Sequence, residues 1–231
     1  MHCVIFDLDG TLLDTIEDIR HAINYALVAF DGSRISADEC RIFVGHGLMN
    51  ALQSAVLSHV PELRDDGEFE LMYSLMMGYY RNHPADYAKP YDGIKELLET
   101  LVEKGVKIGV LSNKRDELVK AIVKAKFPEI PFAFVQGQVD NLPLKPDKRA
   151  FDYALSALHE NVEDIVYIGD SEVDFTAAEN AGAARLIVSY GFRREDDLNR
   201  NGIPSIPHVP SYEEIENAYY EYAKRRNCHI S

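Results

Sequence analysis

The sequence predicts an α/β protein with a parallel-sheet, Rossmann-like core and a helical domain inserted after the first strand. Three observations lead to this prediction. Short apolar runs alternate with helical patterns, one long segment near the amino end shows helical patterns only, and polar residues directly follow three of the apolar runs. Strands that alternate with helices of ordinary length form parallel sheets with helices on both faces.

Five apolar runs are expected to be the strands of the core. They are residues 3–6, 106–111, 132–135, 165–168 and 185–188. Apolar residues at three- and four-residue spacing predict helices between them, at Ile94, Leu97, Leu98 and Leu101, at Leu118, Ile122 and Val123, and at Phe151, Ala154, Leu155 and Leu158. A last helix is expected from Ser211 to about Arg226, where Ser211 and Glu214 form a capping box.

Residues 15–84 interrupt the alternation, because they contain no convincing strand. Helix spacing recurs there, for example at Ile19, Ile23 and Ala26. We therefore expect an α/β core of residues 1–14 and 85–231, with a helical domain of residues 15–84 inserted into it. The hinges are expected near residues 13–15 and 82–90, where Pro84 and Pro90 interrupt helix.

Composition limits the classes of partner. The 231 residues include 24 Lys and Arg against 38 Asp and Glu, for a net charge of −14, which argues against binding to nucleic acid or to anionic membranes. No apolar stretch approaches the roughly 20 residues that span a bilayer, and the first apolar run stops at Asp7 without a basic leader. Three widely spaced cysteines indicate a reducing compartment. We expect a cytoplasmic monomer or homodimer.

Reactive side chains follow three of the expected strands. Asp7 and Asp9 follow the first, Ser112 and Asn113 the second, and Asp170, with Asp174 four residues later, the fourth. Lys145 precedes an expected helix. Ligands of parallel α/β sheets bind beyond the carboxyl ends of the strands, so these groups are expected to meet at one edge.

Four carboxylates at one edge require a cation. Two unit charges 4 Å apart repel by about 4 kcal/mol at an effective dielectric constant near 20, and Lys145 offsets only one charge. Carboxylates and water suit Mg²⁺, which usually keeps positions open for phosphate oxygens. One carboxylate could then attack phosphorus while another acts as general acid and base. The residues alone leave open which of Asp7 and Asp9 does which.

The motifs DLDGT after a strand, SN after a second strand, a single Lys before Pro, and GDxxxD after a later strand resemble the haloacid dehalogenase superfamily. They occur in the family's order from Asp7 to Asp174. The helical insertion resembles the subclass with an α-helical cap. Within that subclass, DTxxDI at residues 14–19, VGHG at residues 44–47 and SNK at residues 112–114 resemble the phosphoglycolate phosphatase group.

The resemblance implies a role for each matching residue. Asp7 would be the nucleophile and Asp9 the general acid and base, while Asp7, the Asp9 carbonyl and Asp170 would bind Mg²⁺. Ser112, Asn113 and Lys145 would hold the phosphoryl group, Thr11 would support their loop, and Asp174 would orient Lys145 or metal-bound water. The cap loop with His46 and Gly47 would close over the site and contact the leaving group.

Several alternatives stay open at this point. Asp9-Gly10 could be only a turn, Ser112-Asn113 or Asp174 a helix N-cap, Lys145 a solvated lysine, and His46 structural. Lys114 and Arg115 are interpreted as salt-bridge partners on the next helix.

The expected substrate is a small phosphorylated metabolite, with phosphoglycolate first. Inorganic pyrophosphate, or a broad range of sugar phosphates and nucleotides, is the alternative. Metal-free dehalogenation is disfavoured because Asp9 is kept, and mutase activity because Ile19 stands where such mutases carry His. A phospho-accepting signalling domain or a phosphate-binding module without turnover is the alternative of another class.

Overall fold

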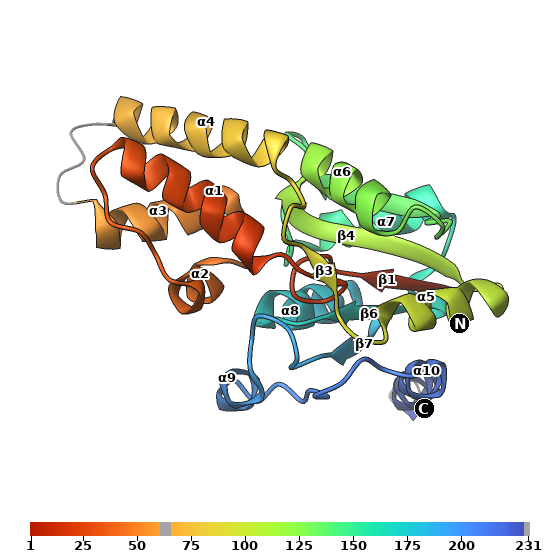
Figure 1. The fold of residues 1–231 in the computed structure, drawn as a ribbon. Coiled ribbons are helices and arrows are strands. Elements are labelled where there is room, and N and C mark those ends of the chain that lie inside the picture. Colours follow the sequence, from red (N-terminus) through yellow and green to blue (C-terminus); the bar gives the residue numbers. More distant parts are fainter. Residues whose placement is uncertain (61–65, 229–231) are drawn as a thin grey trace.

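The main sheet has five parallel strands in the order β5-β4-β1-β6-β7 (Figure 1). The structure is a computed structural model that describes residues 1–60 and 66–228. The strands are β1 (Cys3–Phe6), β4 (Lys107–Arg115), β5 (Phe134–Gln138), β6 (Ile165–Gly169) and β7 (Ala184–Ile187). The predicted α/β class and parallel core are confirmed. The prediction for β4 was too short, because this strand continues four residues past Leu111.

Helices cover both faces of the sheet. Side chains along each strand point alternately to opposite faces, and on each face they join an apolar cluster that packs against helices. In β1, Val4 and Phe6 belong to one cluster, and Cys3 and Ile5 belong to the other. The first cluster includes residues of α5 (Ile94–Glu103), α6 (Asp116–Lys126) and α10 (Tyr212–Cys228), and the second includes residues of α7 (Lys148–Leu158) and α8 (Glu172–Ala181). Short helical turns form η1 (Val162–Asp164) and α9 (Glu195–Arg200).

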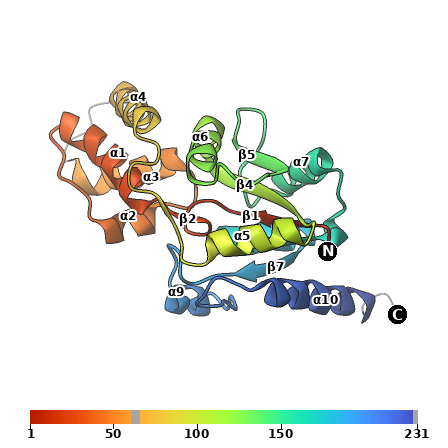
Figure 2. The ribbon, with the colours of Figure 1, turned by 45° about the vertical axis from the view of Figure 1, so that its right-hand side comes forward.

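Four helices follow the first strand and lie beside the sheet, at the left of Figure 1. They are α1 (Ile16–Ala29), α2 (Ala37–Phe43), α3 (Leu48–His59) and α4 (Asp66–Asn82). We call residues 15–84 the helical insert; its residues 61–65 lie outside the described part of the chain. The first apolar cluster continues into the insert through side chains such as Leu52 and Met72. Figures 1 and 2 show the carboxyl ends of the strands turned toward the insert.

A short antiparallel ribbon joins the insert to the core. It pairs β2 (Leu13–Asp14) with β3 (Lys89–Pro90), so the chain leaves and re-enters the core side by side. The expected hinges fall at this ribbon. The ribbon itself was not predicted, because strands of two residues are too short to show alternation.

The helix ends confirm one capping prediction and correct two alternatives. Ser211 Oγ accepts from the Glu214 N–H at 3.2 Å, and Glu214 Oε2 accepts from the Ser211 N–H at 2.8 Å, which is the expected capping box. Asp174 is not an N-cap, because Ser171 caps α8 and Asp174 is the third residue of that helix. Ser112 and Asn113 lie inside β4 and do not cap α6.

Membrane-spanning helices are absent from residues 1–60 and 66–228, since none of their helices is both long and apolar enough.

Candidate active site

A cavity of about 50 Å³ lies between the carboxyl ends of the central strands and the helical insert. The predicted residues that line it are Asp7, Asp9, Gly47, Ser112, Asn113, Lys145, Asp170 and Asp174. Thr11 and His46 are not among its lining residues. Residues from four core segments and from the insert therefore meet here, as the parallel topology predicts.

Asp7 directly follows β1, where its N–H donates to the Ile168 carbonyl at 2.9 Å and ties it to β6. Its Oδ1 lies 3.0 Å from Lys145 Nζ. That approach is outside hydrogen-bond geometry, and Oδ1 accepts no hydrogen bond from any described residue. Burial raises the pKa of Asp7 to about 7 against the lowering effect of Lys145, and the neighbouring Asp174 and Asp9 add to the rise. Asp7 is thus a buried carboxyl group whose Oδ1 has an ion-pair partner but no hydrogen-bond donor.

Lys145 is held by three groups. Its ammonium donates to Asp174 Oδ1 at 2.7 Å and to the Tyr167 hydroxyl at 2.8 Å, and it forms the ion pair with Asp7. Burial lowers the pKa of Lys145, but Asp174 and Asp7 outweigh this and raise it. Lys145 is therefore a fixed cation inside the site, and the interpretation as a solvated lysine is wrong. Tyr167 was not singled out from the sequence, since a tyrosine within a strand carries no motif.

Asp174 uses both carboxylate oxygens within the protein. Oδ1 accepts from Lys145 and from the Tyr167 hydroxyl, and Oδ2 accepts from Ser171 Oγ at 2.5 Å and from the Asp170 N–H at 3.2 Å. Burial raises the pKa of Asp174, yet Lys145 and these hydrogen bonds hold it below its ordinary value. These contacts suit a carboxylate that orients its neighbours.

Asp170 follows β6 and faces Asp7. Its Oδ2 accepts from the Phe192 N–H at 2.6 Å. Burial, followed by the charges of Asp174 and Asp7, raises the pKa of Asp170 well above its ordinary value. Carboxylate oxygens of Asp7, Asp170 and Asp174 lie within 4.8 Å of one another, which is close enough to share one metal ion.

The cavity's charges and donors fit a divalent cation. Four carboxylates line the cavity against three cationic side chains, those of Lys114, Lys145 and Arg193, which leaves a formal charge of −1 when all are ionised. The oxygen donors suit Mg²⁺. Asp7 Oδ1 forms an ion pair with Lys145 but accepts no hydrogen bond, whereas both oxygens of Asp174 accept hydrogen bonds, so Asp7 and Asp170 are the side chains that fit the role of ligands.

Asp9 is fixed by two donors that reach the same oxygen. Thr15 Oγ1 donates to Asp9 Oδ1 at 2.5 Å, and Lys114 Nζ donates to it at 2.7 Å. Lys114 is a salt-bridge partner as interpreted, but it lies in β4 and not on the next helix, and it is buried and lines the cavity. Its position in the sequence, directly after Ser112-Asn113 at the end of an expected strand, could have indicated that Lys114 belongs to the site.

Asn113 holds two loops together through its side-chain amide. Oδ1 accepts from the Lys145 N–H at 2.8 Å, while Nδ2 donates to the Lys145 carbonyl at 3.0 Å and to the Gly45 carbonyl at 3.3 Å. The amide group therefore joins Lys145 to the insert. The Ser112 hydroxyl lines the cavity and accepts only a long 3.4 Å bond from the Lys114 N–H.

The loop after Asp7 brings its backbone against Asp170. Gly10 has φ +82°, and a Cβ at this position would overlap with the Asp170 carboxylate. Thr11, the next residue, is buried, and its carbonyl accepts from the Tyr190 hydroxyl at 2.9 Å. Thr11 therefore lies within the loop and does not line the cavity, and its role in supporting the loop stays a prediction.

The insert contributes apolar and backbone groups to the cavity. They belong to Ile19, Val44, Gly45, Gly47 and Leu48. The side chain of His46 is exposed, so its predicted contact with substrate stays a prediction.

Arg193 was not predicted and lies where the core meets the insert. Its guanidinium donates to the carbonyls of Arg41 at 2.6 Å and Val44 at 2.9 Å, and it pairs with Glu172.

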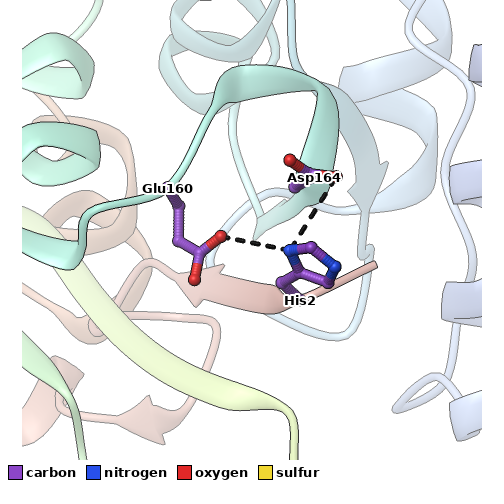
Figure 3. Close-up of side chains that lie close together, drawn as sticks. All are labelled: His2, Glu160 and Asp164. Atoms are coloured by element: carbon purple, nitrogen blue, oxygen red, sulfur yellow. Dashed lines mark ion pairs between the residues drawn. The ribbon is translucent and has the colours of Figure 1, made fainter.

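A second cluster with metal-ligating residue types lies at the amino end of the sheet (Figure 3). His2 Nδ1 is 3.3 Å from Glu160 Oε2 and 3.9 Å from Asp164 Oδ1. Glu160 already pairs with Lys107 Nζ at 2.6 Å, and the His2 side chain is 65% exposed. These contacts are those of a surface ion-pair group, so the cluster near Asp7 is the better metal site.

The parallel sheet, the helical insert and the carboxylates at the strand ends define a Rossmann-like α/β protein with a carboxylate-rich site at the edge of its sheet. Comparison with protein families gives a match to the haloacid dehalogenase-like hydrolase family over residues 4–188. The chain belongs to this family.

Individual relatives agree with the family. The chain is 32% identical to a phosphoglycolate phosphatase of Caulobacter vibrioides over 83% of this chain and 81% of the relative. It is 29% identical to a phosphoglycolate phosphatase of Neisseria meningitidis over 94% of each chain. A crystal structure of a predicted phosphoglycolate phosphatase from Haemophilus somnus matches with a TM-score of 0.81 and 26% identity, over 89% of this chain and 93% of the other.

Proposed function

We propose that the protein is a Mg²⁺-dependent phosphatase that hydrolyses a small phosphomonoester through an aspartyl-phosphate at Asp7. The observation that carries this proposal is the state of Asp7. It is buried beside the Lys145 ammonium, and its Oδ1 accepts no hydrogen bond from the described residues. A buried carboxylate that is held by an ion pair and not by hydrogen bonds, beside a fixed cation and two further carboxylates, suits nucleophilic attack on phosphorus.

Mg²⁺ would be held by Asp7, Asp170 and the backbone carbonyl of Asp9. When bound, the ion supplies positive charge beside the carboxylates and the phosphoryl oxygens. Asp174 would keep its hydrogen bonds to Lys145 and Ser171 and orient the site from behind. The cluster of Asp7, Asp170 and Asp174 carboxylates within 4.8 Å of one another supports a divalent ion there.

The reaction would proceed in two displacements. Asp7 attacks phosphorus, the bond from phosphorus to the ester oxygen breaks, and Asp9 gives that oxygen a proton. Asp9 then takes a proton from water, which attacks the same phosphorus and releases inorganic phosphate and free Asp7. Lys145 and Ser112 would bind the phosphoryl oxygens throughout.

The substrate would be small, with phosphoglycolate as the first candidate. A cavity of about 50 Å³ is far below the roughly 300–1,000 Å³ of pockets for drug-sized ligands. Two relatives named above are phosphoglycolate phosphatases, which supports the same choice. Ile19 lines the cavity at the position where the sugar-phosphate mutases carry His, so no acid or base is available there.

The test is turnover of a panel with and without Mg²⁺. Phosphoglycolate, sugar phosphates, nucleotides, pyrophosphate and p-nitrophenyl phosphate would be compared by kcat/KM. We expect many turnovers per enzyme, and the highest kcat/KM for the smallest monoesters. A preference for pyrophosphate or nucleotides would show that the proposed substrate is wrong. A single stoichiometric phosphorylation without release of phosphate would show that the protein is a phospho-accepting module and not an enzyme.

The nucleophile is tested by Asp7→Asn. This variant should lose turnover by at least about a thousandfold and keep its fold by circular dichroism, because the change is nearly isosteric. Rates close to wild type would assign the nucleophile elsewhere.

A further inference from the structure

Lys114 is a buried cation that the reaction described above does not use. Its side chain is 1% exposed, although burying an ammonium group is costly without a partner. Its Nζ is 2.7 Å from Asp9 Oδ1, across 105 residues of sequence. Lys145, the other cavity lysine, contacts Asp7 and Asp174 instead. The two lysines therefore serve different carboxylates.

The hydrogen bonds to Asp9 are one-sided. Lys114 Nζ and Thr15 Oγ1 both donate to Oδ1. Among the described residues none donates a hydrogen bond to Asp9 Oδ2, and the Asp9 side chain, which lines the cavity, is 18% exposed. Two donors on one oxygen fix the carboxylate plane and leave the other oxygen for proton transfer.

The ammonium of Lys114 is itself held from the insert. It lies 4.7 Å from the ring centroid of Tyr80, in cation–π geometry. Tyr80 belongs to α4 and is fully buried, so its ring cannot turn away without disturbing the core of the insert. Lys114 thus stands between a fixed ring of the insert and the carboxylate of Asp9.

We infer that Lys114 is a positioning residue that holds Asp9 in the orientation needed for proton transfer to the leaving group. The inference rests on the proposed function, because it assigns Asp9 the acid and base role. Lys114 acts on the reaction only through Asp9. Its removal should therefore matter most where protonation of the leaving group matters most.

The experiment compares two phosphomonoesters in wild type and Lys114→Met. An alkyl phosphate has a poorly leaving alkoxide that needs a proton, whereas p-nitrophenolate leaves without one. We expect kcat/KM to fall about 30-fold or more for the alkyl phosphate and less than about threefold for p-nitrophenyl phosphate. Lys120→Met, at an exposed lysine of α6, is the matched control and should match wild type on both substrates.

A double-mutant cycle separates positioning from a general structural role. Asp9→Asn should be nearly inactive, and adding Lys114→Met to it should change its residual rate less than about twofold. Should Lys114→Met not fold, Lys114→Gln, which keeps a donor without the charge, enters the same comparisons.

Equal losses on both substrates, or a further large loss in the Asp9→Asn background, would overturn the role of Lys114 while leaving the phosphatase intact. A wild-type protein with no turnover of any phosphoester would instead overturn the proposed function itself, and this inference with it.

Discussion

Asp7 and Asp174 both contact the Lys145 ammonium, but their other partners differ. The charge of Lys145 and hydrogen bonds on both oxygens of Asp174 outweigh its burial and lower its pKa. Asp7 Oδ1 accepts no hydrogen bond, and burial raises the pKa of Asp7 to about 7. Two aspartates in one cluster therefore take different roles, because one is saturated by the protein and the other is left for a ligand.

Gly10 allows the loop after Asp7 to approach Asp170, which gives a prediction for Gly10→Ala. The added Cβ would overlap with the Asp170 carboxylate, and φ +82° costs a non-glycine residue about 1–2 kcal/mol. We expect kcat to fall by about a hundredfold or more, together with a lower melting temperature. Steady-state kinetics and thermal unfolding measure the two effects.

Gly105→Ala is the matched control for this variant. Gly105 has a similar φ of +71°, and no described atom lies within 4 Å of its would-be Cβ. It should lose stability from the same backbone strain and keep wild-type kcat. A comparable loss of kcat in both variants would mean that strain, and not the contact with Asp170, controls activity.

At the scale of elements, the sequence predicted the five strands of the sheet because buried parallel strands are continuous apolar runs. The same reasoning ended β4 at Leu111, where apolar residues stop, although hydrogen bonding continues to Arg115. Lys114 was therefore placed on the next helix and not at the end of the strand. Its partners Asp9 and Tyr80 come from distant segments, and no local pattern reports such contacts.

Arg193 connects the segment after β7 to the insert, which gives a prediction for Arg193→Ala. The variant loses two hydrogen bonds to the carbonyls of Arg41 and Val44. Bonds from a charged donor contribute about 1.5–3 kcal/mol each when intact, so the insert should close over the cavity less often. We expect KM to rise about tenfold or more, with a smaller change in kcat.

The neighbouring Arg194→Ala is the control. Arg194 is 76% exposed and only 3.9 Å from Asp38, a surface pair of little energetic value. Its kinetic constants should stay within about twofold of wild type. If Arg193→Ala shows the same unchanged KM, Arg193 does not hold the insert against the core.

At the scale of the whole molecule, the motifs predicted which segments meet, and the topology explains why. β1, β4 and β6 are adjacent in the sheet, so the residues at their carboxyl ends share one edge, although Asp9 and Lys114, for example, lie 105 residues apart in the sequence. The contribution of the insert was harder to predict, because VGHG places glycine backbone at the cavity and leaves His46 exposed. Side-chain orientation in an irregular loop depends on packing that the pattern does not encode.

Metal binding at this edge should stabilise the entire fold. A ligand that binds only the native state stabilises it by about 2.7 kcal/mol at a hundred times its Kd. For a chain of this size that corresponds to a rise in melting temperature of about 5–10 °C. Chelator-treated protein should thus melt at a lower temperature and show no turnover, and it should regain its melting temperature and its turnover when Mg²⁺ is added.

The rise in melting temperature on adding Mg²⁺ should largely disappear in Asp170→Asn, whereas Asp152→Asn, at an exposed position of α7, should keep it. An equal rise in both variants would locate the stabilising ion away from Asp7 and Asp170.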